Sequence, residues 1–363
     1  MNTVCDRDMC TGCYACYNSC NKDAIMIIDS IKSFNAIIDS QKCINCGKCF
    51  AICPVNNEIP AIEPLLWLEG CADPEIRRKS SSGGLATKIA IDYANSGGYV
   101  CSCLLINGSF QFSITNDLNI IRKFAGSKYV KSSIKNVLDD IKVLLSNNQR
   151  LLFIGLPCQV AAVKRITNDN PLLTTIDLLC HGTPSKSVLD AYLKDNNINL
   201  NNVSDIKFRE KNDFGLIVDM IRLAPNRVVD FYTLAYLAGL DYTENCYHCP
   251  FAKSDRISDI TLGDSWSATP EKQKSGISLI LCQTQKGIDL VAQSKLDLEK
   301  VNPQLAKKTN HQLVSPSIPH LKRNYFIDAL IRGKKFSTAF IIAMPKDAAK
   351  QIIKWILTII HIL

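Results

Sequence analysis

Residues 10–20 read CTGCYACYNSC, and residues 43–54 read CINCGKCFAICP. The four cysteines of the first stretch recur in the second at a constant offset of 33 residues, so the two stretches are an internal repeat. Each half has the spacing C-x2-C-x2-C-x3-C, which is typical of bacterial ferredoxins. In that arrangement three thiolates hold one [4Fe–4S] cluster and the fourth reaches the other cluster. The repeat therefore predicts two [4Fe–4S] clusters.

The crossed arrangement divides the eight cysteines into two predicted ligand sets. One set is Cys10, Cys13, Cys16 and Cys53, and the other is Cys20, Cys43, Cys46 and Cys49. Two short apolar segments between the halves, residues 24–28 and 35–39, are expected to form small strands. The alternatives are zinc binding and a disulfide framework. Zinc sites more often have paired C-x2-C units, and a disulfide framework requires a secreted chain.

Composition narrows the class of protein. The chain has 363 residues, 17 cysteines and a formal net charge of +8, so it has room for two or three domains. Its first eight residues carry charges and no apolar stretch, and many cysteines in a reducing compartment indicate metal binding, so we expect a cytoplasmic protein. Basic residues are spread among 34 acidic ones, which favours an acidic partner, an anionic cofactor or a membrane surface over nucleic acid.

The rest of the chain alternates strand and helix patterns. Strands are expected at residues 98–115 (a hairpin turning at Asn107-Gly108), 151–154, 174–179, 205–209, 216–223 and 258–263, and helices at residues 85–94, 135–145, 159–166 and 185–195. This alternation predicts a partly parallel sheet. Functional groups in such sheets collect beyond the carboxyl ends of the strands.

A possible anion-binding loop precedes the first of these helices. Residues 77–84 read RRKSSSGG. Serine and glycine before a helix present free backbone N–H groups to an anion, and three cations stand just upstream. The stretch fits a phosphate-binding loop for a nucleotide cofactor, and it fits equally well an ordinary N-cap beside a flexible loop.

Four further cysteines lie in loops next to Gly, Pro or His: Cys158, Cys180, Cys246 and Cys249. Four thiolates from three loops are sufficient for a third cluster. Alternatively, Cys246 and Cys249 form a small zinc or redox dithiol unit and the other two are incidental. His181 and His248 stand beside these cysteines, where histidine more usually donates hydrogen bonds than ligates.

Seven motifs occur in an order that resembles the coenzyme F420 hydrogenase/dehydrogenase beta subunit family, over residues 65–300. They are residues 79–84, 126–129, 155–159, 180–185, 208–211, 246–250 and 259–264. The resemblance implies an FAD-binding iron–sulfur reductase in which Cys158, Cys180, Cys246 and Cys249 ligate a third [4Fe–4S] cluster. It also implies FAD contacts from Lys79, Ser81, Ser82, Gly83, Gly84, Ser127, Lys128 and Tyr129. Branches of the family differ in substrate, and many bacterial members are associated with polysaccharide biosynthesis.

The expected fold is α+β or α/β, in four parts. These are a 2[4Fe–4S] ferredoxin-type domain at residues 1–60, a flavin-binding region at 61–135, a mixed α/β iron–sulfur and flavin domain at 136–310, and a helical tail at 311–363. The tail is helix-like over residues 338–363 with Pro345 interrupting it, and its last part has the pattern of a basic amphipathic helix. Its apolar run is shorter than the roughly 20 residues that span a bilayer. We expect it to dock on protein, with peripheral contact with the inner face of the membrane as second choice.

These features together predict an iron–sulfur flavoprotein oxidoreductase that passes electrons between ferredoxin-type clusters and FAD. A flavin exchanges single electrons with clusters and a hydride with an organic substrate, possible substrates including polysaccharide precursors. His181 and Lys128 are candidate proton donors near the flavin. One alternative is an electron-transfer beta subunit that serves a redox partner and has no substrate of its own. A zinc-binding protein without redox activity is the other.

Overall fold

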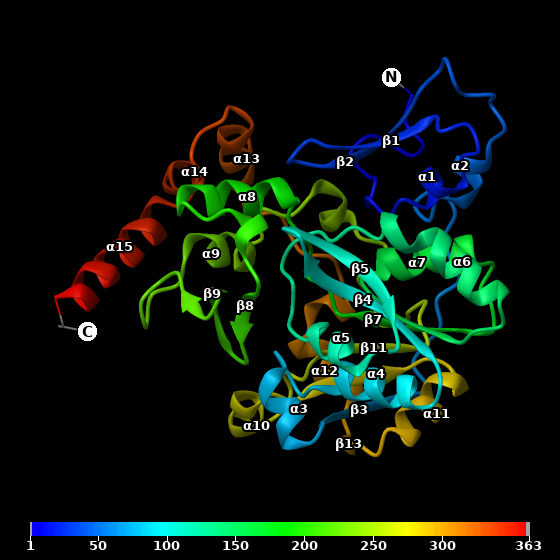
Figure 1. Ribbon diagram of the computed structural model, residues 1–363. Helices are drawn as coiled ribbons and strands as arrows, with labels where there is room; N and C mark the ends of the chain where they lie inside the picture. The colour runs from blue at the N-terminus through cyan, green and yellow to red at the C-terminus, as the bar shows by residue number, and fades with distance from the viewer. Residues whose placement is uncertain (1, 361–363) are drawn as a thin grey trace.

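The computed structural model describes residues 2–360 and is built on one large mixed sheet (Figure 1). Its strands are β3 (Leu66–Cys71), β4 (Tyr99–Ile106), β5 (Ser109–Thr115), β6 (Leu151–Gly155), β7 (Leu173–Leu178), β11 (Ile260–Asp264), β12 (Ser278–Cys282) and β13 (Asp297–Lys300). The strand order is β13-β3-β12-β11-β7-β6-β4-β5. The four strands β4, β6, β7 and β11 run parallel, and the remaining strands pair antiparallel. Strands from residues 61–135 and from residues 136–310 therefore share one sheet.

Two smaller antiparallel sheets accompany it. The first is the hairpin of β1 (Ile25–Asp29) and β2 (Phe34–Ile38), and the second consists of β8 (Ile206–Glu210), β9 (Asp213–Val218) and β10 (Ile221–Arg222).

Helices surround the three sheets. The α-helices are α1 (Ala15–Ser19), α2 (Lys48–Ile52), α3 (Pro74–Lys79), α4 (Leu85–Asn95), α5 (Leu118–Lys123), α6 (Leu138–Ser146), α7 (Pro157–Ile166), α8 (Lys186–Asp195), α9 (Phe231–Leu237), α10 (Pro270–Ser275), α11 (Gln285–Gln293), α12 (Pro303–Thr309), α13 (Arg323–Ile331), α14 (Phe336–Ala343) and α15 (Pro345–Ile359). Short 3-10 turns occur at η1 (Lys135–Val137), η2 (Leu200–Asn202), η3 (Glu244–His248) and η4 (His311–Leu313).

Both faces of the large sheet are covered. On one face Ile89 of α4 shares an apolar core with Leu152 of β6, together with residues of α5 and α11. On the other face Val160 of α7 shares a core with Phe153 of β6, together with residues of α6. Neighbouring residues of a strand point to opposite faces, so a strand buried on both sides is apolar throughout, which explains the continuous run of β6.

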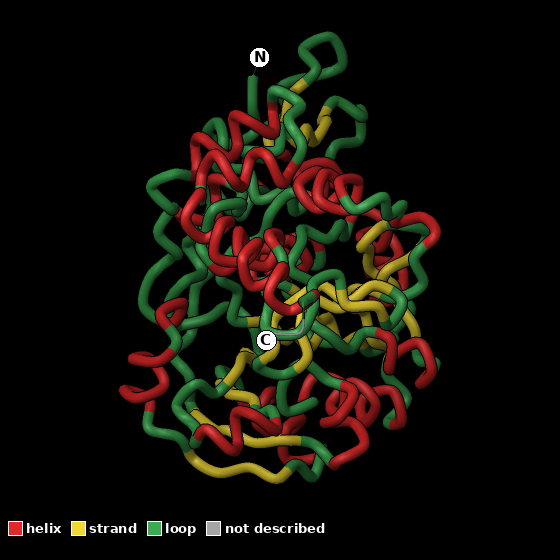
Figure 2. Tube along the Cα trace, turned by 90° about the vertical axis from the view of Figure 1, so that its left-hand side faces the viewer, coloured by secondary structure: helices red, strands yellow, loops and turns green. Residues whose placement is uncertain are grey.

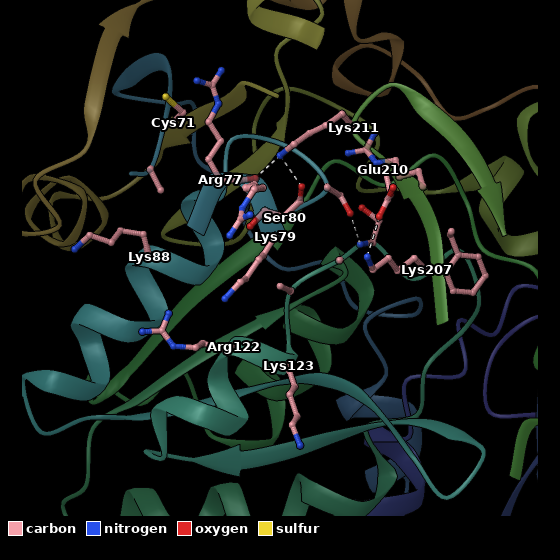
Figure 3. Close-up of a pocket in the computed structure, with 18 of the residues that line it drawn as sticks. Cys71, Arg77, Lys79, Ser80, Lys88, Arg122, Lys123, Lys207, Glu210 and Lys211 are labelled. Carbon is pink, nitrogen blue, oxygen red and sulfur yellow. Dashed lines mark hydrogen bonds and ion pairs between the residues drawn. The ribbon is translucent and has the colours of Figure 1, made fainter. Parts of the chain in front are cut away.

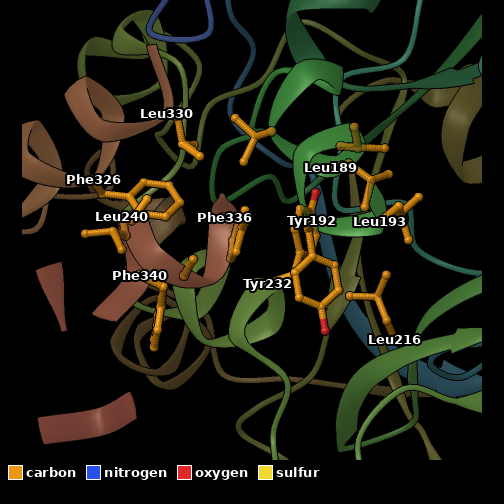
Figure 4. Packing of buried hydrophobic residues seen from close by; sticks show 14 of the residues in the cluster. Leu189, Tyr192, Leu193, Leu216, Tyr232, Leu240, Phe326, Leu330, Phe336 and Phe340 are labelled. Atoms are coloured by element: carbon orange, nitrogen blue, oxygen red, sulfur yellow. The ribbon is translucent and has the colours of Figure 1, made fainter. Parts of the chain in front are cut away.

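A third apolar core joins α8, α9, α13 and α14 to the three-stranded sheet (Figure 4). Leu189 and Leu193 of α8, like Phe336 and Phe340 of α14, are four residues apart and so lie on one face of their helix. These faces meet around Tyr232 of α9, which is almost completely buried. The core fixes η3 and its cysteines relative to the sheet, because α9 directly precedes that turn.

The N-terminal module, residues 2–57, sits on α7 (Figure 1). Its helices α1 and α2 both pack against α7, and Arg165 of α7 donates to the carbonyl oxygen of Asn57 at 2.8 Å. The backbone N–H of Val4 donates to the carbonyl oxygen of Ala36 at 2.9 Å, which adds the first residues to the β1–β2 hairpin. The repeat is therefore held against α7, the helix whose first turn carries Cys158.

Several expected elements are confirmed. The two small strands between the cysteine repeats are β1 and β2, and the Asn107-Gly108 hairpin is β4 and β5 with both turn residues at positive φ. Ser185 caps α8, since its Oγ accepts from the N–H of Ser187 at 3.0 Å. The expected partly parallel sheet is also present.

The expectation for residues 205–223 is partly wrong. The sequence predicts a turn over residues 211–214 and a second strand over residues 216–223. In the structure Glu210 already pairs with Asp213, because Lys211 adopts a left-handed conformation (φ 55°) that closes the hairpin early. Strand β9 then ends at Val218, and a second turn separates it from β10.

Helix α15 lies away from the N-terminal module (Figure 1), whereas Arg323 of α13 donates to the carbonyl oxygen of Lys32 in the β1–β2 turn at 3.3 Å. Pro345 is the first residue of α15, so it separates this helix from α14, and residues 361–363 of the expected tail lie outside the described residues. Figure 2 views the molecule with the left side of Figure 1 toward the reader, so that α15 points forward while the N-terminus is at the top. Within residues 2–360, no helix has the length and apolar character needed to cross a membrane.

Candidate iron–sulfur centres and a basic cavity

The first predicted ligand set, Cys10, Cys13, Cys16 and Cys53, is brought together and is called the buried set below. All four side chains line one small cavity, and each residue is 6% exposed or less. Gly12 takes a left-handed conformation (φ 63°), which lets the loop curl so that its N–H donates to Cys10 Sγ at 3.4 Å. This convergence of four thiols fits a [4Fe–4S] cluster.

The second set, Cys20, Cys43, Cys46 and Cys49, lies nearer to solvent and is called the outer set. Cys46 is exposed, and burial followed by the charges of Cys20 and Cys43 raises the pKa of Cys49. Asn45 N–H donates to Cys43 Sγ at 3.4 Å, which repeats the bond from Gly12 to Cys10 in the first half. Backbone N–H groups aimed at sulfur suit a thiolate ligand, so both halves fit the predicted clusters.

The third set, Cys158, Cys180, Cys246 and Cys249, also comes together in space. Cys158 is in the first turn of α7, Cys180 follows β7, and the other two belong to η3 and its end. Burial and then the charges of the other three cysteines raise the pKa of Cys180. Thr243 Oγ1 lies 3.5 Å from Cys246 Sγ, and Asn245 Nδ2 donates to the same sulfur at 3.8 Å.

A buried ion pair fixes the loop that carries Cys249. Arg256 lies 3.2 Å from the carboxylate of Asp177 in β7, and both side chains are 2% exposed or less. Arg256 also donates to the carbonyl oxygens of Phe251 and Leu178. The pair therefore ties the segment after Cys249 to the end of β7, two residues before Cys180.

The ligands of a single metal ion and those of an iron–sulfur cluster differ in geometry. Among residues 2–360, no three Cys, His, Asp or Glu side chains are placed to hold one metal ion. A [4Fe–4S] cluster binds each of its four thiolates through a different iron atom, so its ligands do not converge on one point.

A large basic cavity lies between β8 and the segment from the end of β3 through α3 (Figure 3). Its volume is about 1300 Å³, and twelve Lys or Arg residues line it against four Asp or Glu. The cations are Arg77, Arg78, Lys79, Lys88, Arg122, Lys123, Lys128, Lys207, Arg209, Lys211, Lys274 and Lys295. An excess of cations in a concave site favours an anionic ligand.

Lys211 organises one wall of the cavity. Its ammonium donates to the carbonyl oxygens of Arg77, Ser80 and Ser82, which follow or end α3. Burial, reinforced by the neighbouring charge of Arg77, lowers the pKa of Lys211 to about 8. A cation at the carboxyl end of a helix satisfies its free carbonyl groups, so the loop after α3 is held open toward the cavity.

Two regions of the chain match families of known proteins. Residues 148–304 match the family described as the C-terminal region of the coenzyme F420 hydrogenase/dehydrogenase beta subunit, and residues 9–57 match the 4Fe–4S dicluster domain. Residues 148–304 therefore belong to the C-terminal region of the coenzyme F420 hydrogenase/dehydrogenase beta subunit family, and residues 9–57 belong to the 4Fe–4S dicluster domain. The resemblance inferred from the motifs is confirmed.

One solved structure that contains a chain similar to this one is the xenon-derivatised F420-reducing [NiFe] hydrogenase complex from Methanosarcina barkeri. The similar chain is 18% identical, and the TM-score is 0.47 over 70% of this chain and 91% of that chain. No curated protein matches the chain.

The residues that the family resemblance assigns to FAD divide into two groups. Lys79, Ser81, Ser127 and Lys128 line the basic cavity, whereas Ser82, Gly83, Gly84 and Tyr129 do not. Ser127 N–H donates to Ser81 Oγ at 2.9 Å, which joins the two motifs.

The non-lining residues have structural contacts. Gly83 N–H donates to Ser278 Oγ at 3.0 Å, and a Cβ at Gly83 would lie 2.5 Å from the carbonyl oxygen of Gly70. Tyr129 stacks on Tyr236 with ring centroids 4.3 Å apart, and burial raises its pKa to about 12. These residues therefore shape the wall behind the cavity.

The two candidate proton donors differ in environment. Lys128 lines the cavity, its ammonium donates to the carbonyl oxygens of Phe124 and Ala125, and burial lowers its pKa. His181 does not line the cavity, and its Nδ1 lies 2.7 Å from Gln312 Nε2. Burial, then the charge of His311, lowers the pKa of His181 to about 4, so the imidazole is neutral near pH 7.

Sequence reasoning missed two residues at these centres. Cys5 lines the same cavity as the buried set, and hydrogen bonds to Cys10 and Cys53 are the largest causes that raise its pKa. Lys131 places its ammonium 3.3 Å from Cys158 Sγ. Cys5 was visible as a fifth cysteine just before the repeat, whereas Lys131 belongs to none of the motifs that the sequence singles out.

Proposed function

We propose that this protein is an iron–sulfur flavoprotein oxidoreductase that passes electrons between its dicluster domain and FAD in the basic cavity. The third set would hold an intermediate [4Fe–4S] cluster. The organic substrate would react at the cavity, where the excess of cations favours an anionic molecule. FAD, when bound, supplies the conversion between single-electron and hydride transfer.

The observation that carries this proposal is the position of the third set between the other two sites. Cys158 and Cys249 share the apolar core of Cys13 from the buried set. On its other side Cys246 packs against a group of tyrosines that also contacts Tyr129, next to Lys128 on the cavity wall. A continuous packed route therefore runs from the dicluster domain to the cavity.

Exposure indicates where an external redox partner would exchange electrons. Cys46 of the outer set is exposed, whereas every member of the buried set is buried. A partner can approach the outer set most closely, and the buried set faces α7 and Cys158. This arrangement also suits the second candidate function, an electron-transfer subunit that turns over substrate only together with a partner protein.

The test is chemical analysis of the full chain purified without oxygen. We expect roughly 12 iron atoms with matching sulfide, corresponding to three clusters, and one FAD per chain. Cys246→Ser should remove about a third of the iron, whereas Cys103→Ala, a change at a cysteine outside the three sets, should remove none. Zinc without acid-labile sulfide would refute the proposal. Turnover only after addition of a partner would favour the second candidate.

A further inference from the structure

Lys131 is a buried lysine whose ammonium contacts a cysteine sulfur. Its side chain lies in the loop before η1, the residue is 9% exposed, and its backbone N–H donates to the carbonyl oxygen of Pro184 at 2.9 Å. Within residues 2–360, the hydrogen-bond partner of the ammonium is Cys158 Sγ, at 3.3 Å, and no carboxylate forms an ion pair with it. A buried charge is costly unless opposite charge compensates it, so the compensation must come from sulfur.

Both neighbouring cysteine sets supply that compensation. The Lys131 ammonium lies 3.3 Å from Cys158 Sγ of the third set. Cys158 packs in the same apolar core as Cys13 of the buried set, so the cation is buried beside both sets. The cation thus interacts electrostatically with the third set and with the buried set. Cys158 is the closest sulfur.

We propose that Lys131 is an electrostatic positioning residue for electron transfer, which raises the reduction potentials of the third cluster and, to a smaller extent, of the buried-set cluster. This inference rests on the proposed function. Cluster potentials depend on net charge, on hydrogen bonds to the sulfurs and on solvent exposure, and Lys131 acts through the first two. One electron leaves the donor centre and enters the acceptor centre, no bond forms or breaks, and Lys131 keeps its protons.

The expected order of the effects follows from the geometry. The third cluster should respond most, because the Lys131 ammonium contacts Cys158 directly. The buried-set cluster should respond less, and the outer-set cluster should respond least, because its cysteines lie nearer to solvent, which screens a charge. Lys131 thereby favours electron movement from the dicluster domain toward the cavity.

The experiment compares reduction potentials in the anaerobically purified full chain, measured by redox titration with EPR detection. Lys131→Met removes the charge, Lys131→Arg keeps it, and Lys135→Met removes an exposed cation four residues away that lies 4.4 Å above the Tyr17 ring. We expect Lys131→Met to decrease the reduction equilibrium constant of the third cluster at least tenfold, or about 59 mV for a one-electron couple. Lys131→Arg should stay within about threefold, and Lys135→Met should match the unmodified protein.

Two results would overturn the inference. An unchanged potential in Lys131→Met with full iron content would show that the charge has no electrostatic role. Loss of iron from both Lys131→Met and Lys131→Gln would make Lys131 a structural residue instead. The proposed function is tested independently of Lys131, because the iron and FAD content of the unmodified protein tests it before any variant is made.

Discussion

The Arg256–Asp177 ion pair gives the sharpest test of how the third set is held together. Arg256→Met leaves Asp177 buried without its counter-ion and removes the donor from the carbonyl oxygens of Phe251 and Leu178. Removing one partner of a buried pair costs about 3–5 kcal/mol. Because two carbonyl oxygens also lose a donor, we expect the loss of stability to lie near the upper end of this range. It is measured as the decrease in the free energy of unfolding in denaturant.

The pH dependence of this effect has a definite sign. Burial already raises the pKa of Asp177 in the intact pair, and loss of Arg256 raises it further. The folded variant therefore binds a proton that the unfolded chain, with a carboxyl pKa of about 3.9, releases. Protonation relieves the uncompensated charge as pH falls, so the loss of stability in Arg256→Met should be larger at pH 8 than at pH 5.

Two further variants complete the test. Arg256→Met combined with Asp177→Leu should recover most of the lost stability, because an apolar replacement of a buried pair is often close to neutral. Lys272→Met, which breaks the exposed pair with Glu299, should cost less than about 1 kcal/mol. A double variant no more stable than Arg256→Met alone would refute the reasoning. Iron analysis of the same samples should show that the third cluster is lost with Arg256.

Three other predictions test the remaining parts of the site. Cys5→Ser should keep the iron content of the protein but shift the potential of one dicluster signal, because Cys5 contacts the buried set without belonging to it; loss of iron would make Cys5 a ligand. Lys79→Glu should weaken FAD binding at least tenfold in fluorescence titration, whereas Lys186→Glu, at a solvent-facing ion pair with Asp190 outside the cavity, should leave it unchanged; equal affinities would remove FAD from the cavity. His181 has a pKa of about 4 in the fold and about 6.5 unfolded, so the unfolded chain binds more protons between these values. Its contribution to stability is complete above pH 6.5 and falls away toward pH 4, and His181→Gln should unfold with a weaker dependence on pH in that window; an unchanged dependence would contradict the assigned pKa.

The dicluster repeat was predictable from the sequence because its ligands are local. Cys10, Cys13 and Cys16 are spaced by the chain itself, and the constant offset of the second half identifies the crossed ligands without knowledge of the fold. The β1–β2 hairpin between the halves has equally local signals. These features therefore needed only spacing and periodicity.

The third set was not predictable from spacing. Cys158 and Cys249 are 91 residues apart in sequence (249 − 158), and their proximity depends on β7, η3 and the Arg256 pair. The position of these cysteines in loops left a third cluster as one of two alternatives, and the family resemblance implied it. The basic cavity was not predictable from spacing either, because Arg122 and Lys207 are distant in sequence and line the same cavity only through the tertiary structure.

Only part of the predicted phosphate-binding loop lines the basic cavity. Ser81 faces the cavity, but Gly83 lies so close to Gly70 that its lack of a side chain serves packing. Serine and glycine composition does not distinguish a residue that lines a cavity from a glycine that allows close packing. Strands β3 and β12, which form this wall, were not predicted because short apolar runs without turn signals resemble buried helix as much as strand.

The central claim, that three cysteine sets form a route from the dicluster domain to the cavity, is tested most directly by EPR spin integration of the fully reduced chain. The account predicts three reduced [4Fe–4S] clusters per chain, with one signal lost in Cys246→Ser and the two dicluster signals retained. Two clusters in the unmodified protein, both unaffected by Cys246→Ser, would contradict it.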